Sequence, residues 1–178
     1  MVTSTAIKAE FGRMMELAQQ GFHCSDILVS MGLEAQGKIN PDAVRLASAF
    51  AGGIGFCGDI CGAFTGGACL LGLYAGRGAS DEEEDPKLRI MISELMDWFS
   101  TEQEARYGGI HCSDITEDDP QNMPMRCPQI VGAVYLKVRT ILDQNGFDWK
   151  AGAQPVRREQ TVQSCSAACP VAAGMRGA

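Results

Sequence analysis

The sequence lacks the features that mark membrane, nucleic-acid-binding and secreted proteins. Its least polar stretch, residues 63–75, is short and rich in glycine, so we expect no membrane span. It has no basic stripe, and a net charge of −7 argues against binding nucleic acid or an anionic membrane. The N-terminus has no charged start followed by an apolar stretch and a cleavage site. We therefore expect a cytoplasmic protein with neither nucleic acid nor membrane among its partners.

Signatures of common enzyme classes are also missing. No glycine-rich phosphate loop follows a predicted strand, which counts against a nucleotide site. No Ser/His/Asp signature is recognisable, and only two histidines occur in the 178 residues. The sequence therefore assigns no catalytic residue, and whether the protein is an enzyme, for example an oxidoreductase, stays open.

Cysteine, by contrast, is abundant, with eight residues in the chain. Thiols stay reduced in the cytoplasm, where disulfides are rare. So many cysteines in that compartment indicate metal binding or redox chemistry rather than structural disulfides.

The apolar residues recur at helical spacing, and no segment reads as a convincing strand. Glycine, asparagine and proline mark the starts and stops. The pattern predicts an all-α fold, a single-domain bundle of about six helices within residues 1–150. The predicted helices are 5–20, 25–36, 41–51, 58–74, 86–107 and 128–144. Residues 151–178 have little apolar material for a core, so we expect a flexible tail that includes Cys165 and Cys169.

A pentapeptide, His-Cys-Ser-Asp-Ile, occurs twice without change, at residues 23–27 and 111–115. Each copy follows a glycine and an apolar residue at the end of a predicted helix. The serine or aspartate of each copy suits a helix cap, because short polar side chains accept bonds from the first free N–H groups. Capping does not explain the cysteines, Cys24 and Cys112.

Three cysteines, Cys24, Cys112 and Cys127, are predicted at helix starts. Unpaired N–H groups and the positive end of the helix dipole lie there. This setting lowers a thiol pKa and favours the thiolate, which binds metals and attacks disulfides. The adjacent His23 and His111 are open to three interpretations: metal ligand, proton donor or surface residue.

A further group of cysteines recurs every four residues. Positions 57, 61, 65 and 69 are occupied by Cys57, Cys61, Thr65 and Cys69. On one continuous helix these residues would share a face. Cys69 is best explained as a core residue. Cys61 has the most distinctive setting, since the neighbouring glycines at positions 58, 62 and 66 allow a close approach of another backbone or of a cofactor. Tight helix packing is the simpler of those two explanations.

The segment Cys61-Gly62-Ala63-Phe64-Thr65-Gly66 resembles the CGAxxG motif of the C_GCAxxG_C_C family, which is named for redox-active proteins. That family is marked by four cysteines, which correspond here to Cys24, Cys61, Cys112 and Cys127. The resemblance covers about residues 8–143 and implies a helical fold with a redox role. Some relatives attach c-type haem, but this chain lacks Cys-x-x-Cys-His, so no covalent haem is expected.

Three functions fit these residues. The first is electron transfer by a cysteine-ligated metal cofactor, for which we expect an iron–sulfur cluster, with zinc as the alternative. The four family cysteines would hold it, with Cys57, His23 or His111 as candidate further ligands. The second is thiol–disulfide exchange at the same cysteines. The third is a metal-stabilised helical scaffold without catalysis. A redox partner protein and a homodimer are further expectations, and the sequence identifies no particular partner.

Overall fold

The computed structural model describes residues 4–155, and this part of the chain is all-helical. It contains an isolated antiparallel β bridge between Ile60 and His111. The α-helices are α1 (Ser4–Gln19), α2 (Cys24–Ala35), α3 (Pro41–Ala47), α4 (Gly62–Ala75), α5 (Lys87–Tyr107), α6 (Cys112–Thr116) and α7 (Met123–Gln144). Two 3₁₀ turns, Ser48–Phe50 and Pro120–Asn122, complete the regular structure. The prediction of an all-α fold is confirmed.

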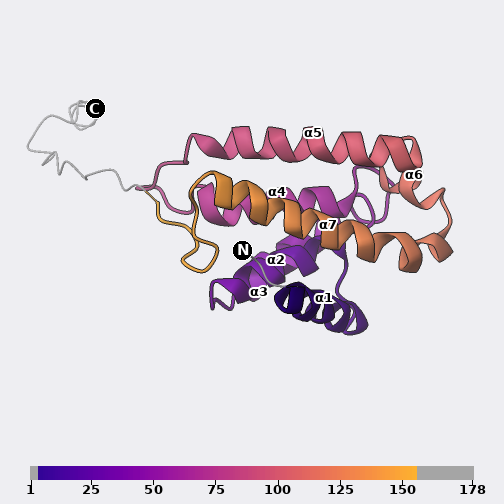
Figure 1. The fold of residues 1–178 in the computed structure, drawn as a ribbon, viewed down its shortest axis with the longest axis horizontal. Coiled ribbons are helices and arrows are strands. Elements are labelled where there is room, and N and C mark those ends of the chain that lie inside the picture. Colours follow the sequence, from indigo (N-terminus) through magenta and orange to yellow (C-terminus); the bar gives the residue numbers. More distant parts are fainter. Residues whose placement is uncertain (1–3, 156–178) are drawn as a thin grey trace, which may run out of the picture.

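Helix α4 is the centre of the bundle. It contacts α2, α5 and α7, while α1 lies outside against α2 and α7 (Figure 1). Most of its side chains are buried, including Phe64, Leu70, Leu71 and Tyr74. None of the helices in residues 4–155 combines the length and the apolar character needed to cross a bilayer.

Two glycines of α4 are explained by close helix packing. A Cβ atom on Gly66 would lie 2.6 Å from the Cα of Ser25 on α2, and one on Gly67 would lie 2.6 Å from the side-chain Cγ1 of Val134 on α7. Real Cβ contacts are essentially never this short, so glycine at position 66 lets the backbones of α2 and α4 come together, and glycine at position 67 makes room for the Val134 side chain. The interpretation of the small residues as packing positions holds for Gly66.

Several predicted boundaries differ from the structure. The third helix ends at Ala47 and continues only as the 3₁₀ turn, and the fourth begins at Gly62 rather than residue 58. The last helix begins at Met123 rather than Pro128, since Pro124 fits its first turn and Pro128 is tolerated inside it. A helix start was predicted at Cys112, where α6 begins, but no helix from there was included among the six predicted ranges. These changes move Cys57 out of α4 and Cys127 into α7.

The C-terminal end of the described chain packs on the bundle. Trp149 stacks on Tyr74, with ring centroids 5.4 Å apart, and its backbone carbonyl accepts a hydrogen bond of 2.8 Å from the Tyr74 hydroxyl. Residues 156–178 lie outside the described residues, together with Cys165 and Cys169. A domain boundary at residue 150 therefore stays a prediction.

Replacing Gly66 by alanine tests the contact between α2 and α4. The added methyl group would meet backbone atoms of Ser25, which have little room to move, so we expect a loss of about 1–3 kcal/mol in the free energy of unfolding. Gly12→Ala on α1 is the matched control, because no atom lies within 4 Å of that Cβ. Urea denaturation should show the control unchanged or up to about 1 kcal/mol more stable. Equal effects of the two substitutions would contradict this packing.

Candidate functional site: four cysteines around one cavity

The two copies of the pentapeptide form the same local structure. His23 and His111 are the N-caps of α2 and α6, and each cysteine is the first helical residue. Asp26 accepts a hydrogen bond of 2.8 Å from the backbone N–H of His23, and Asp114 accepts one of 3.1 Å from that of His111. Each aspartate therefore accepts a bond from a backbone N–H at its helix start, as predicted, but it does so from the third helical position, and histidine rather than aspartate is the N-cap.

The serines of the two copies behave differently and do not cap. Ser113 Oγ donates a hydrogen bond of 3.0 Å to the carbonyl of Gly58. Ser25 Oγ is buried without a partner where α2 meets α4. The capping prediction was therefore wrong for both serines, which occupy the second helical position in each copy.

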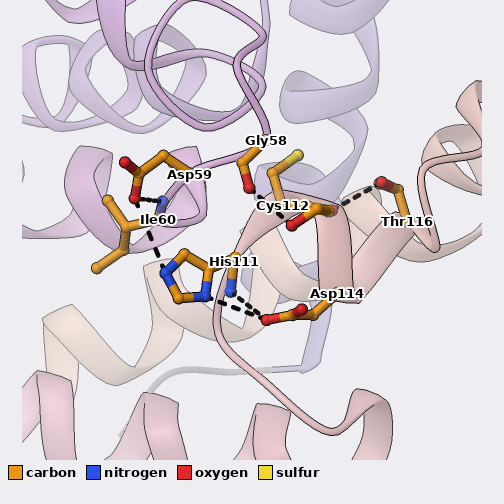
Figure 2. A network of polar contacts seen from close by, with 8 residues as sticks. Gly58, Asp59, Ile60, His111, Cys112, Asp114 and Thr116 are labelled. Atoms are coloured by element: carbon orange, nitrogen blue, oxygen red, sulfur yellow. Dashed lines mark hydrogen bonds and ion pairs between the residues drawn. The ribbon is translucent and has the colours of Figure 1, made fainter.

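A short ladder of backbone hydrogen bonds brings the second copy to the start of α4. Cys61 N–H donates to Ile110 O at 3.1 Å, and Cys112 N–H donates to Asp59 O at 2.7 Å. Figure 2 shows this crossing, with Asp59 and Ile60 beside His111. The ladder connects residues about 50 positions apart in the sequence, and it fixes Cys112 next to the segment that carries Cys61.

The segment before this ladder is a left-handed turn rather than the start of α4. Residues 52–56 all have positive φ angles, including Ile54 at 57° and Phe56 at 63°. Such angles cost L-residues other than glycine roughly 1–2 kcal/mol each. The prediction that Cys57 shares a helical face with Cys61 and Cys69 is therefore wrong. Cys57 is exposed at the end of this turn.

The structure gathers Cys24, Cys61, Cys112 and Cys127 around one cavity of about 460 Å³. They come from four different places: the first residues of α2 and α6, the N-cap of α4 and the second turn of α7. Cys61 and Cys112 are buried, and Cys24 and Cys127 are half-buried. The sequence prediction placed Cys127 just before a helix, but it lies inside α7, where Pro128 is the next residue.

Gly62 permits the closest of these approaches. A Cβ atom at this position would lie 2.5 Å from Cys24 Sγ and 2.7 Å from the carbonyl oxygen of Phe50. The glycine that follows Cys61 in the motif therefore makes room for the sulfur of Cys24. This contact gives the motif a physical role at the cavity.

The thiol pKa values differ from the sequence-based expectation. Burial raises the pKa of Cys61 to about 12 and that of Cys127 to about 11, and it also raises the pKa of Cys24 and Cys112. Backbone N–H groups act in the opposite direction. Those of Gly52 in the left-handed turn and Ser25 in the first turn of α2 lower the pKa of Cys24, and that of Ala63 in the first turn of α4 lowers the pKa of Cys61. The predicted lowering was wrong because desolvation of the thiolate outweighs these amides.

The four thiols also affect one another. Cys24, Cys112 and Cys127 each raise the pKa of Cys61 further, since a negative charge on one sulfur disfavours a second one nearby. Cys24 does the same to Cys112 and Cys127. The four sulfurs therefore form one electrostatically coupled group.

The remaining candidate residues occupy different surroundings. His23 is exposed at the wall of the cysteine cavity, where its ring meets Phe56 edge-on at a centroid distance of 5.2 Å. His111 is exposed and does not line the cavity; its Nδ1 lies 3.2 Å from Asp114 Oδ2. Cys69 packs with Val29 and Leu33 in a small core cluster, which confirms its expected role.

A second cavity of about 280 Å³ adjoins the first. Cys112, Phe56, Gly52 and Met123 line both, and Cys57 lines only the second. Cys57 is thus near the four-cysteine group without belonging to its cavity. Among the described residues, no group of three or more His, Cys, Asp or Glu side chains is arranged to hold a metal ion.

Sequence reasoning missed much of the cavity wall. Phe56 lies on the strained turn, and no sequence signal for that conformation exists beyond the glycines around it. Met14 and Met15 of α1 line the cavity, and no sequence signal singled them out as site residues. Met123 lines it as well.

Together, the fold and the cavity define a class of all-helical proteins with four cysteines gathered from separate elements. The family model described as "Putative redox-active protein (C_GCAxxG_C_C)" matches residues 22–141, and the chain belongs to this family. The match spans both copies of the pentapeptide and all four cysteines. No curated protein and no solved structure matches the chain.

The raised thiol pKa values predict a pH-dependent stability for the reduced, metal-free protein. The unfolded chain loses its cysteine protons near the usual value of 9.0, whereas folded Cys61 keeps its proton to about pH 12. The folded state therefore binds more protons between these values, and the free energy of unfolding should fall as the pH rises from 9 towards 12.

Comparing the wild type with Cys61→Ala isolates the contribution of this thiol to the pH dependence of the free energy of unfolding. Tyrosines and lysines also titrate in this pH range, but they do so in both proteins and their effect cancels. Urea denaturation at pH 8 and above pH 10 should show a smaller fall in the free energy of unfolding for Cys61→Ala than for the wild type. For Cys57→Ala, which changes an exposed cysteine, the free energy of unfolding should fall by as much as in the wild type. If the free energy of unfolding fell equally in Cys61→Ala and in the wild type, the claim that burial raises the pKa of Cys61 would be wrong.

Proposed function

We propose that this protein is an electron-transfer protein whose four cysteines, Cys24, Cys61, Cys112 and Cys127, hold an iron–sulfur cluster. The observation that carries the proposal is their convergence from four elements on one cavity. Iron–sulfur clusters are held by cysteine thiolates, commonly four of them. The donor set at the cavity fits this group.

The raised pKa values favour a cofactor over thiol–disulfide exchange. An attacking cysteine needs substantial thiolate at working pH and access to its partner. Here burial raises the pKa of all four thiols, and two of the four are buried. Bound metal supplies the positive charge that keeps a coordinating thiol deprotonated, so the same burial is compatible with metal binding.

The size of the cavity favours a cluster over zinc. A single zinc ion brings its four donors to within roughly 2.3 Å of one point. A cluster with several iron atoms accepts ligands that lie farther apart around a larger volume. The cavity of about 460 Å³ provides that volume.

The surroundings of the sulfurs would tune the reduction potential. When bound, the cluster would supply one-electron redox chemistry; the protein would supply hydrogen bonds and exclude water. The N–H groups of Gly52 and Ser25 point to Cys24, and that of Ala63 points to Cys61. Apolar side chains such as Ile27 and Ile115 limit access of water.

The test is anaerobic purification or reconstitution of the full chain, followed by analysis of iron, acid-labile sulfide and the visible spectrum. We expect stoichiometric iron and sulfide in the wild type, and loss of the cluster in Cys24→Ser, Cys61→Ser, Cys112→Ser and Cys127→Ser. Cys57→Ser and Cys69→Ser are matched controls, since neither residue lines the cysteine cavity, and both should keep the cluster.

Two outcomes would overturn the proposal. A colourless, metal-free protein with a reversible disulfide would favour thiol–disulfide exchange. Zinc alone, bound in one equivalent with no redox response, would favour a structural metal site. Circular dichroism of each serine variant would show whether the loss of iron follows from loss of the helical fold.

A further inference from the structure

The cysteine cavity extends beyond what a metal cluster needs. Its wall includes Phe11, Met14, Met15 and Ala18 of α1, none of which offers a thiolate, imidazole or carboxylate. Ile130 and Val131 of α7 line it as well. The whole cavity, including the space that a cluster would fill, measures about 460 Å³ and lies in the range of pockets that bind small organic molecules, roughly 300–1,000 Å³.

Among the described residues, the lining carries no charged carboxylate, lysine or arginine. Apart from the cysteines, the polar side chains of this described lining are Gln19 and His23, and both are exposed. Moving a charged ligand into this lining would cost its hydration without a compensating partner. The cavity therefore suits an uncharged, mostly apolar molecule that accepts a hydrogen bond at one edge.

Large apolar side chains are exposed where the cavity is lined by α1 and the left-handed turn. Phe11 is 42% exposed, Met15 37% and Phe56 57%, and all three line the cavity. Phe56 also holds a positive φ of 63°, which costs free energy for a residue with a side chain. Strain of this kind is found at ligand sites, where the surroundings maintain it. Neither the exposure nor the strain contributes to folding.

The identity of these side chains points to a flat ring. Phe11, Phe22 and Phe56 offer aromatic faces and edges, and methionine sulfur contacts aromatic rings favourably. Gln19 and His23 can donate a hydrogen bond to a carbonyl oxygen on such a ring.

We infer that the part of the cavity between α1 and α7 binds an uncharged aromatic or quinonoid ring compound beside the four cysteines. The choice of a redox-active ring rests on the proposed electron-transfer function. The site itself rests on the volume, the uncharged lining and the exposed apolar side chains around it.

Duroquinone is a suitable probe, because its fully substituted ring does not add thiols. Equilibrium dialysis of the anaerobic, iron-loaded full chain should show saturable binding of one molecule per chain. Ala18→Trp places an indole on the α1 wall of the cavity, and it should weaken binding by about tenfold or more. Leu46→Trp is the matched control on α3, where the side chain is 74% exposed and outside the cavity; it should bind like the wild type.

Iron content and the visible spectrum are measured on the same samples. This inference would be overturned if the iron-loaded wild type showed no saturable binding of the probe, or if Ala18→Trp bound the probe as tightly as the wild type. Neither result would contradict the proposed cluster. If the chain took up no iron during anaerobic reconstitution and still bound the probe in a way that Ala18→Trp weakens, the ring site would be supported and the proposed function overturned. If both Ala18→Trp and Leu46→Trp bound the probe tightly, the probe would bind elsewhere on the surface and not in the cavity.

Discussion

The contact between the glycine face of α4 and the first turn of α2 determines where the cysteines meet. Gly66 lies directly against the backbone of Ser25, and one turn earlier Gly62 lies against the sulfur of Cys24. This approach places the N-cap of α4, Cys61, beside the start of α2. The ladder between residues 58–61 and 110–113 then brings in Cys112, and α7 completes the cavity with Cys127. A larger residue at either glycine would separate two of the four sulfurs from the rest.

Burial sets the chemistry that these sulfurs support. Removal from water raises the pKa of each thiol, and backbone amides near Cys24 and Cys61 offset only part of that change for these two. The raised pKa values disfavour the thiolate that attacks disulfides, and a bound metal would supply the positive charge that keeps these sulfurs deprotonated. The same amides and apolar walls would then control the potential of a bound cluster. A single feature, a desolvated group of four thiols, thus disfavours disulfide exchange and favours a cofactor.

The helical periodicity predicted the fold class and five helices to within a few residues, since long amphipathic segments carry a strong signal. Boundaries near Cys57 and Cys127 were wrong for local reasons: a left-handed turn replaces the expected first turn of α4, and Met123-Pro124 opens α7 before Cys127-Pro128 does. The resemblance to the family named the four cysteines, and the fold brings these same four to one cavity. Their pKa values were not predictable, because burial depends on contacts between distant segments. The α1 wall of the cavity was missed for the same reason.

The most direct test of the central claim is a crystal structure of the anaerobically prepared protein, with anomalous diffraction data collected at the iron absorption edge. The account predicts a compact group of iron peaks in the cavity, each within bonding distance of Sγ of Cys24, Cys61, Cys112 or Cys127. Continuous density joining two of these sulfur atoms as a disulfide, or iron bound elsewhere with the cavity free of it, would contradict the account.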